Sequence, residues 1–386
     1  MNKVLILGAF ITLLFAFSSC RSDSYLENTN GLTIVHLKGT AHERGAAYGR
    51  LLQQEIAETV SAWRKELELS FDRDFSMIIQ DFFRETNYRA QIETVDPELL
   101  EEVYGMSETS GIDFNTLLAF QMSEELFTVY KQDNRRNCTA VGKTRTDSTA
   151  SILAQNMDPD QFLHDHPVVL HIIPPGNEPE QFVFTSAGLL GLAGMNEQGV
   201  AVTCMSMSML NSETAGLPVV SVIRKILLQP GLEEAEVFLN QTSFAIPQCF
   251  GLGGPEGVRC FECSANRIEE FYPFKDRDVV LHTNFSIRNR DFNKEFIKLL
   301  EQYGKTVDDP YFCPRYFLAY DLIEEYNMSL DVERIETILR LPMPELEPIL
   351  NENTLGTLVM ELSNKPTLFL SVGHEEGSEF HRLTFP

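Results

Sequence analysis

The sequence predicts an α/β chain of the α+β type, in which a mostly helical first part is followed by packed sheets covered by helices. Two observations favour this fold class. Before residue 138, apolar residues recur at helical spacing. After residue 138, short β-rich runs and helical stretches arrive in blocks instead of alternating regularly. Because a doubly wound parallel sheet is built from alternating strands and helices, this order favours packed sheets with helices outside them.

The helical part begins after a candidate strand at 32–37. In the stretch 41–69, apolar side chains at steps of three and four predict one buried helical face. These side chains are Leu52, Ile56, Val60, Trp63 and Leu67. A second helical stretch is expected at 76–95.

Cap residues mark the next two helices. Asp96-Pro97 predicts the start of a third helix, because Asp favours the cap and Pro is tolerated in the first turn. Gly111 predicts the end of that helix, since glycine adopts the left-handed conformation that often terminates one. Asp113 then predicts the cap of a fourth helix.

The part after residue 138 predicts strands separated by helices. The expected strands are 151–154, 168–173, 181–185, 200–205, 279–283, 357–362 and 367–372. The expected helices are 219–228, 233–240, 314–326 and 332–341. The sequence has no internal repeat and no phosphate-binding loop of the GxxxxGK[ST] or GxGxxG kind, so nucleotide binding is not indicated.

The N-terminus predicts export and lipidation. Lys3 precedes the apolar run Val4–Phe17, which is too short to cross a bilayer and is typical of a signal peptide. Ser18-Ser19-Cys20 follows, and small residues before a cysteine resemble a bacterial lipobox. We therefore expect Cys20 to be lipidated and to anchor the chain in the bacterial cell envelope, facing the periplasm or the outer surface. The membrane contact would be through the lipid alone.

The composition narrows the classes of partner. A net charge of −25 argues against nucleic acid as a partner. Seven cysteines in 386 residues are too few for a dense disulfide scaffold. Cys260 and Cys263 have the spacing of a metal pair, but no second pair follows and the segment alternates like a strand. Core thiols or a local disulfide are therefore favoured there, and no metal or organic cofactor is expected.

Cys138 is the best candidate nucleophile. It ends a polar run, Asp133–Asn137, in which a buried structural cysteine would be unusual. An internal thiol has a pKa near 8.5 and needs a base. If the bond between Asn137 and Cys138 is cut, the new α-amine has a pKa of about 7.7–8.0 and lies beside the thiol. One residue then supplies both nucleophile and base. The same thiol could attack the Asn137 carbonyl to make the cut.

Five short motifs occur in a recognisable order. They are NCTAV at 137–141, QNMD at 155–158, GMNEQG at 194–199, HTN at 282–284 and CPRYF at 313–317. Together with GTAHERGAAYGRLL at 39–52, they resemble the isopenicillin N acyltransferase-like family and, more distantly, the conjugated bile acid hydrolases. Both are N-terminal-nucleophile (Ntn) hydrolases, in which the residue exposed by self-cleavage is the catalytic one.

The resemblance implies a domain organisation and a reaction. After the signal peptide at 1–20, it implies a mostly helical prosegment at 21–137 and a catalytic domain at 138–386. The catalytic domain should be a four-layer αββα sandwich with Cys138 opening a central strand, and the cleaved prosegment should stay bound as a partner chain. The reaction would be hydrolysis or acyl transfer of a small linear N-acyl amide through a Cys138 thioester.

The resemblance also implies roles around Cys138. Asp158 would accept a hydrogen bond from the α-amine, while Asn156 would secure the backbone of the same turn. Gln155 stands where bile acid hydrolases carry an arginine, which disfavours bile salts as substrate. GMNEQG is interpreted as a hairpin turn.

Two further polar residues and a serine complete the candidate site. Asn284 is expected to donate its amide N–H to the negative oxygen of a tetrahedral intermediate. Arg315 would lower the pKa of the α-amine through its fixed charge. Ser206 stands where bile acid hydrolases have an asparagine that supports the oxyanion hole, so it is a candidate for the same role or for support.

Two other functions remain open at this point. In a papain-like enzyme, His282 would be the base for Cys138, although the papain-type cysteine signature is absent. Alternatively, the chain is a binding lipoprotein with this fold and no catalysis, in which case it would remain uncut.

Overall fold

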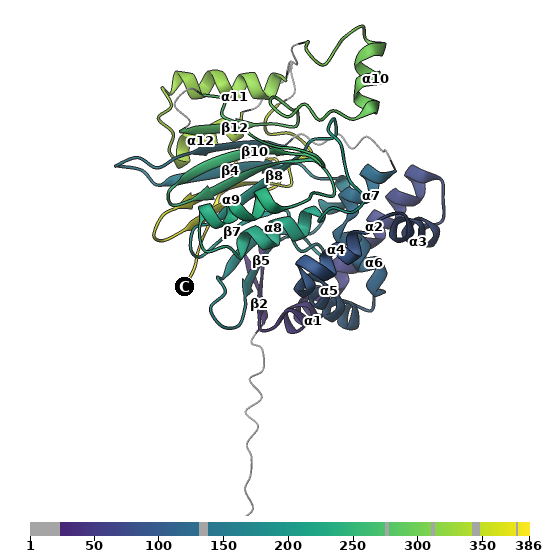
Figure 1. The fold of residues 1–386 in the computed structure, drawn as a ribbon. Helices are drawn as coiled ribbons and strands as arrows, with labels where there is room; N and C mark the ends of the chain where they lie inside the picture. Colours follow the sequence, from purple (N-terminus) through teal and green to yellow (C-terminus); the bar gives the residue numbers. More distant parts are fainter. Residues whose placement is uncertain (1–23, 131–137, 275–277, 310–312, 342–347, 376) are drawn as a thin grey trace, which may run out of the picture.

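The computed structural model describes residues 24–130, 138–274, 278–309, 313–341, 348–375 and 377–386. Two β-sheets form the centre of the molecule, and helices cover their outer faces (Figure 1). The helices α1 to α7 gather on one side of the sheets, at the purple and blue end of the colour scale in Figure 1. The segment expected to be a signal peptide, Cys20 and Asn137 lie outside the described residues.

The first sheet contains nine strands among the described residues, in the order β1-β2-β5-β6-β7-β8-β9-β10-β11. Its neighbouring strands are antiparallel except for the parallel pair β2 and β5. The strands are β1 (Tyr25–Thr29), β2 (Leu32–Lys38), β5 (Pro167–Ile173), β6 (Gln181–Ser186), β7 (Ala193–Asn196), β8 (Ala201–Ser206), β9 (Gln248–Gly254), β10 (Gly257–Cys263) and β11 (Ile268–Glu270). Strands from both sides of Cys138 therefore share one sheet.

The second sheet contains six antiparallel strands among the described residues, in the order β12-β3-β4-β13-β14-β15. They are β3 (Thr139–Lys143), β4 (Ser151–Met157), β12 (Val279–His282), β13 (Gly356–Leu362), β14 (Thr367–Val372) and β15 (His381–Thr384). The strand β3 lies between β12 and β4, so the residue that precedes it is held in the interior of the sheet.

The helices fall into three groups. The first part holds α1 (Ala41–Leu51), α2 (Gln53–Phe71), α3 (Phe75–Glu85), α4 (Tyr88–Val95), α5 (Pro97–Ser110), α6 (Phe114–Gln121) and α7 (Ser123–Val129). The nine-stranded sheet is covered by α8 (Val219–Leu227) and α9 (Leu232–Gln241), and the six-stranded sheet by α11 (Pro314–Glu325) and α12 (Val332–Leu339). The helix α10 (Lys294–Gln302) stands apart (Figure 1), and a 3-10 turn occupies Gln161–Leu163.

Three apolar cores hold these layers together. One lies between the two sheets and includes Cys138, Leu153 and Phe184. A second packs α1 to α9 on the outer face of the nine-stranded sheet, and a third packs α11 and α12 on the six-stranded sheet. The order helix, sheet, sheet, helix confirms the predicted four-layer αββα sandwich.

The helices predicted before residue 138 are present, but two of them are interrupted. The five periodic residues from Leu52 to Leu67 are all buried. However, Leu52 separates α1 from α2, and the second predicted helix is interrupted at residues 86–87. The third helix runs from Pro97 to Ser110 and is capped by Gly111, which adopts φ 78°, as predicted.

Close packing holds α1 against α5 within the first part, and a buried ion cluster links both helices to α8. A Cβ on Gly45 would lie 1.8 Å from the Glu102 carbonyl oxygen, so only glycine allows α1 to approach α5 this closely. The Glu102 carboxylate contacts Arg224 of α8 at 2.9 Å and Arg44 of α1 at 3.5 Å, and all three side chains are buried. This ion cluster therefore joins helices from before residue 138 to a helix that follows it.

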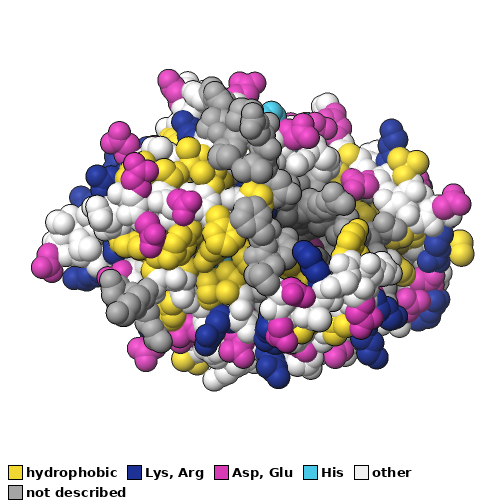
Figure 2. Space-filling model, turned by 90° about the horizontal axis from the view of Figure 1, so that it is seen from above, with side chains coloured by type: hydrophobic (Ala, Val, Ile, Leu, Met, Phe, Trp, Pro, Cys, Tyr) yellow, Lys and Arg dark blue, Asp and Glu magenta, His cyan; other side chains and the backbone are white. Residues whose placement is uncertain are grey.

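Among the described residues, no helix is both long enough and apolar enough to cross a membrane. Figure 2 shows acidic side chains spread over the upper face of the molecule instead of gathering in one patch. This distribution accords with the net charge of −25 and offers no single basic surface on that face.

Candidate active site

Cys138 lies directly before β3, in the core between the two sheets, and is only 3% exposed. Its position follows from the hairpin of β3 and β4, which pairs Thr139 with Asn156. This register returns the chain to Cys138 at the end of β4. The backbone N–H of Asp158 donates to Cys138 Sγ across 3.4 Å. The hairpin therefore brings together the two residues that the motif spacing paired.

The Asp158 side chain is buried in an asparagine- and threonine-rich turn before β13. Its Oδ2 accepts a hydrogen bond of 2.6 Å from Asn351 Nδ2, and Thr354 also donates to the carboxyl group. Burial raises the pKa of Asp158 to about 7, although these donors and the charge of Arg315 act in the opposite direction. Within the described residues, the buried Oδ1 has no hydrogen-bond partner. It is therefore available to a donor such as an α-amine on Cys138.

Arg315 connects the nucleophile to Asn284. The residue lies in the first turn of α11, yet its side chain is buried and points into the site. Its Nη1 donates to the Cys138 carbonyl oxygen at 2.6 Å and to Thr139 Oγ1 at 3.0 Å, and its Nη2 donates to Asn284 Oδ1 at 3.4 Å. A single guanidinium thus fixes the backbone of Cys138 and the orientation of an amide.

Asn284 follows β12, and both the oxygen and the nitrogen of its side-chain amide have a hydrogen-bond partner. Its Oδ1 faces Arg315, and its Nδ2 donates to the Ser206 carbonyl oxygen at 3.3 Å. Since an amide nitrogen carries two hydrogens, one remains to meet an oxyanion. This orientation suits the donor role that the sequence predicted for Asn284.

Ser206 is placed beside Asn284, but its hydroxyl points elsewhere. Along β8, Met205 belongs to the core between the sheets, whereas Cys204 belongs to the core on the outer face. Because side chains alternate along a strand, the Ser206 side chain points outward, where it donates to Glu124 Oε1 of α7. This geometry gives the Ser206 side chain a supporting position.

Asn156 and Gln155 are also supports. Asn156 Nδ2 donates to the carbonyl oxygens of Leu339 and Ile349, at 2.8 and 3.0 Å, which ties β4 to the end of α12 and to the segment after it. Gln155 bridges the two sheets, since its amide donates to the Cys204 carbonyl at 2.6 Å and accepts from the Cys204 N–H at 3.1 Å. Asn156 supports backbone as expected, but the carbonyl oxygens that it binds belong to Leu339 and Ile349 and not to its own turn. Gln155 is committed to the core.

His282 is not suited to be the base that a papain-like enzyme would need. The Nε2 of His282 lies 2.8 Å from Glu262 Oε1, and its Nδ1 faces the Thr283 carbonyl oxygen. Burial opposes protonation of His282, but the neighbouring Cys260 and Glu262 raise its pKa to about 9. A protonated imidazole with both nitrogens engaged cannot take a proton from Cys138.

The other motifs have structural roles. The side chain of Asn196 accepts from the N–H groups of Gln198 and Val200, which confirms a hairpin turn between β7 and β8. It also donates to the carbonyl oxygens of Leu227 and Gln229, at the end of α8 and just after it. Cys260 and Cys263 are both buried, and Cys260 Sγ lies 3.1 Å from Cys249 Sγ. Among the described residues, no cluster of His, Cys, Asp and Glu could hold a metal ion.

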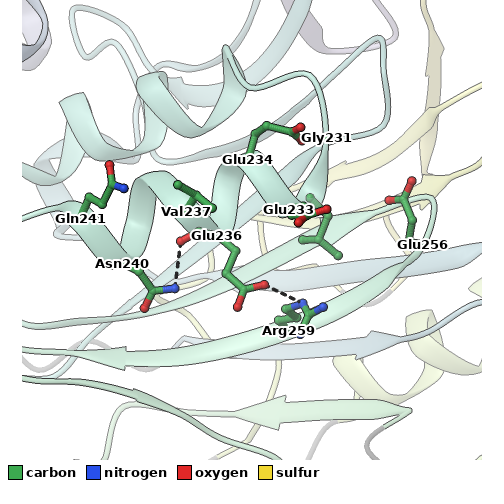
Figure 3. A pocket seen from close by; sticks show the side chains of 10 residues that line it. Gly231, Glu233, Glu234, Glu236, Val237, Asn240, Gln241, Glu256 and Arg259 are labelled. Atoms are coloured by element: carbon green, nitrogen blue, oxygen red, sulfur yellow. Dashed lines mark hydrogen bonds and ion pairs between the residues drawn. The ribbon is translucent and has the colours of Figure 1, made fainter.

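A surface pocket on the outer face is a separate feature. Figure 3 shows it between α9 and β10, where Glu236 pairs with Arg259 at 3.1 Å. None of the residues that line it is a candidate catalytic residue. The pocket therefore has no place in the chemistry of Cys138.

Sequence reasoning missed four residues of the site: Glu124, Gln248, Asn351 and Thr354. The composition of the segment Asn351–Thr354 predicts a turn. It does not show that this turn lies beside Asp158. No local pattern could have linked Glu124 to Ser206, because the two are far apart in sequence. The catalytic roles of Cys138, Asp158, Asn284 and Arg315 remain predictions.

Comparison with known proteins supports the sequence resemblance. The model of the acyl-coenzyme A:6-aminopenicillanic acid acyl-transferase family matches residues 144–302. The chain is also 23% identical to Protein dcd1B of Dictyostelium discoideum over 224 residues, which are 52% of this chain and 43% of that protein. The match thus spans less than half the length of this curated relative.

Solved structures with some similarity include an amidase, an acylase and a hydrolase. The Caenorhabditis elegans orthologue of N-acylethanolamine-hydrolyzing acid amidase has a TM-score of 0.43 and 16% identity, covering 58% of this chain and 92% of that one. Penicillin V acylase from Agrobacterium tumefaciens has a TM-score of 0.41 and 14% identity, covering 64% of this chain and 86% of that one. A mutant of conjugated bile acid hydrolase from Clostridium perfringens has a TM-score of 0.41 and 13% identity, covering 64% of this chain and 92% of that one.

The family match confirms the resemblance to the acyltransferase family that the motifs indicated. The matched residues, 144–302, include Asp158 and Asn284 but not Cys138 or Arg315.

Proposed function

We propose that this chain, which carries the sequence pattern of the acyl-coenzyme A:6-aminopenicillanic acid acyl-transferase family, is a self-cleaving cysteine amidase or acyltransferase. It would act on linear carboxamide C–N bonds through a thioester on Cys138. One observation carries the proposal: Cys138, Asp158, Arg315 and Asn284 form one hydrogen-bonded cluster at the start of β3. Every member is charged, nucleophilic or a potential oxyanion donor.

Self-cleavage comes first in this proposal. Cys138 Sγ attacks the carbonyl carbon of Asn137, the C–N bond between the two residues breaks, and the thiol proton passes to the leaving nitrogen. Water then hydrolyses the thioester, which releases the carboxylate of Asn137 and regenerates the thiol. The new α-amine stays next to Sγ, where Asp158 Oδ1 can accept one of its hydrogens.

Turnover uses the same atoms. The α-amine accepts the thiol proton, the thiolate attacks the substrate carbonyl, and Asn284 Nδ2 donates to the resulting oxyanion. The amine of the substrate then leaves with a proton from the Cys138 ammonium, and water or another amine accepts the acyl group. Arg315 keeps the α-amine less basic, since a nearby positive charge disfavours its protonated form.

The compartment is part of the same proposal. We place the mature enzyme in the bacterial cell envelope, held by a lipid on Cys20 and with its prosegment bound. Support comes from the sequence alone, through the apolar run that ends in Ser18-Ser19-Cys20.

A substrate screen tests the activity. Purified chain would be incubated with penicillins, N-acyl amino acids, acyl homoserine lactones and conjugated bile acids, and the released amine would be measured. We expect release from at least one N-acyl amide, and none with Cys138→Ala. Release that persists in the Cys138→Ala variant would refute Cys138 as the nucleophile.

A further inference from the structure

We infer that Glu124, a residue of the segment before the cleavage point, is a positioning residue for the oxyanion donor Asn284. The inference rests on the proposed function and assigns the prosegment a direct part in turnover. Glu124 lies in α7, whereas Asn284 follows β12 of the six-stranded sheet. The link between them runs through the ends of β8 and β9.

The contact of Glu124 with the sheet is built on a pair of facing residues. Ser206, the last residue of β8, and Gln248, the first of β9, are direct partners across the two strands. Their side chains therefore point to the same face, and Cys204 and Phe250 identify it as the outer face. Glu124 Oε1 accepts from Ser206 Oγ and, at 2.7 Å, from Gln248 Nε2. One carboxylate oxygen thus clamps both strand ends.

The clamp acts on the residue that orients Asn284. The carbonyl oxygen of Ser206 accepts the hydrogen bond of 3.3 Å from Asn284 Nδ2. The position of the Ser206 carbonyl oxygen decides which of the two hydrogens on Asn284 Nδ2 it accepts. It therefore also decides where the second hydrogen points. Hydrogen bonds to a charged carboxylate are stronger than neutral ones, so Glu124 holds this strand end more firmly than a neutral side chain would.

A neighbouring residue distinguishes positioning from simple packing. Glu125 is also on α7 and is 1% exposed, and its Oε1 accepts from the Val219 N–H at 2.7 Å at the start of α8. It therefore ties the same helix to the same catalytic domain at a point away from Asn284. Glu125→Gln is the matched control for Glu124→Gln.

The experiment measures kcat and KM for the two-chain form of wild type, Glu124→Ala, Glu124→Gln and Glu125→Gln. We expect Glu124→Ala to lower kcat by about tenfold to a hundredfold, with KM changed less than threefold. Glu124→Gln, which keeps an acceptor oxygen, should recover most of kcat. Glu125→Gln should lower the melting temperature and leave kcat near that of wild type. Equal kcat losses in Glu124→Ala and Glu125→Gln would overturn the inference.

If Glu124→Ala folds poorly, Ser206→Ala provides a second measurement, because it removes the hydrogen bond to Glu124 from the other side and should lower kcat with little change in KM. Where both variants fold, their losses in kcat should not add. Additive losses would also overturn the inference. Wild type and Cys138→Ala are assayed alongside. If wild type shows no Cys138-dependent turnover, the proposed function fails; if it does and only the Glu124 results disagree, the inference alone fails.

Discussion

Arg315 Nη1 donates a hydrogen bond of 2.6 Å to the carbonyl oxygen of Cys138, the residue that would become the N-terminus of the mature large chain. The same guanidinium reaches Thr139 and Asn284. A fixed positive charge therefore lies next to the proposed base, and the planar group holds three acceptors at once.

Arg315→Ala should shift the pH dependence of turnover. Because a positive charge lowers the pKa of a nearby amine, its removal raises the pKa of the Cys138 α-amine. The rise of kcat/KM with pH should therefore begin at higher pH than in wild type. Arg315→Lys should also lose much of the activity, since a single ammonium cannot reproduce the fork of donors. An unshifted profile with only a raised KM would make Arg315 a substrate-binding residue.

Asn284→Ala should lower kcat by about a hundredfold to a thousandfold, the usual loss for one oxyanion donor, while KM changes little. Asn284→Asp is the matched variant, because it keeps the shape of the side chain and replaces the donor by an acceptor. Both variants should be slow in steady-state assays on matured protein. Wild-type kcat in Asn284→Asp would show that the oxyanion is stabilised elsewhere.

Asp158→Asn should stabilise the uncut chain at neutral and alkaline pH. The folded-state pKa of Asp158 is raised to about 7, mainly by burial, from an ordinary value near 3.8. Ionisation is therefore easier in the unfolded chain, and the destabilisation grows from about pH 4 to pH 7 and then levels off. Asparagine avoids this cost and can still accept from Asn351.

The stability measurement uses Cys138→Ala as background, so that no chain is cut. At pH 8, the melting temperature of Cys138→Ala with Asp158→Asn should exceed that of Cys138→Ala by about 2 °C or more. At pH 4 the two should nearly coincide. A constant difference across this pH range would mean that Asp158 does not titrate as described. In the wild-type background, Asp158→Asn should nevertheless abolish most turnover, because it removes the charged acceptor for the α-amine.

Cys20→Ser should release the protein from the membrane fraction or block its processing, since Cys20 is the only cysteine at the end of the apolar run. Fractionation of the producing bacteria, followed by detection of the chain, measures this. Cys249→Ser, which changes a buried core thiol, is the control and should remain membrane-associated. Unchanged association of Cys20→Ser would remove the lipid anchor from the account.

The layers of the fold and the pairing of Cys138 with Asp158 could be predicted from the sequence, because both depend on local spacing. Helical periodicity, cap residues and the length of the β3–β4 hairpin are all readable along the chain. The breaks at Leu52 and at residues 86–87 were missed, since the apolar pattern continues through them.

The supports of the site could not be predicted, because they depend on which distant strands meet. Asn351 approaches Asp158 only because β13 pairs with β4, and Glu124 reaches Ser206 only because α7 packs against the ends of β8 and β9. The sequence likewise suggested a role for Ser206 in the oxyanion hole. Its orientation depends on strand alternation within a sheet whose order the sequence does not reveal.

Sequencing the N-terminus of the larger chain in purified protein tests whether Cys138 becomes the N-terminal residue. We expect two chains that copurify, with the larger one beginning Cys-Thr-Ala-Val, and one uncut chain in Cys138→Ala. A homogeneous single chain that nevertheless turns over an amide would contradict the claim that Cys138 acts as an N-terminal nucleophile.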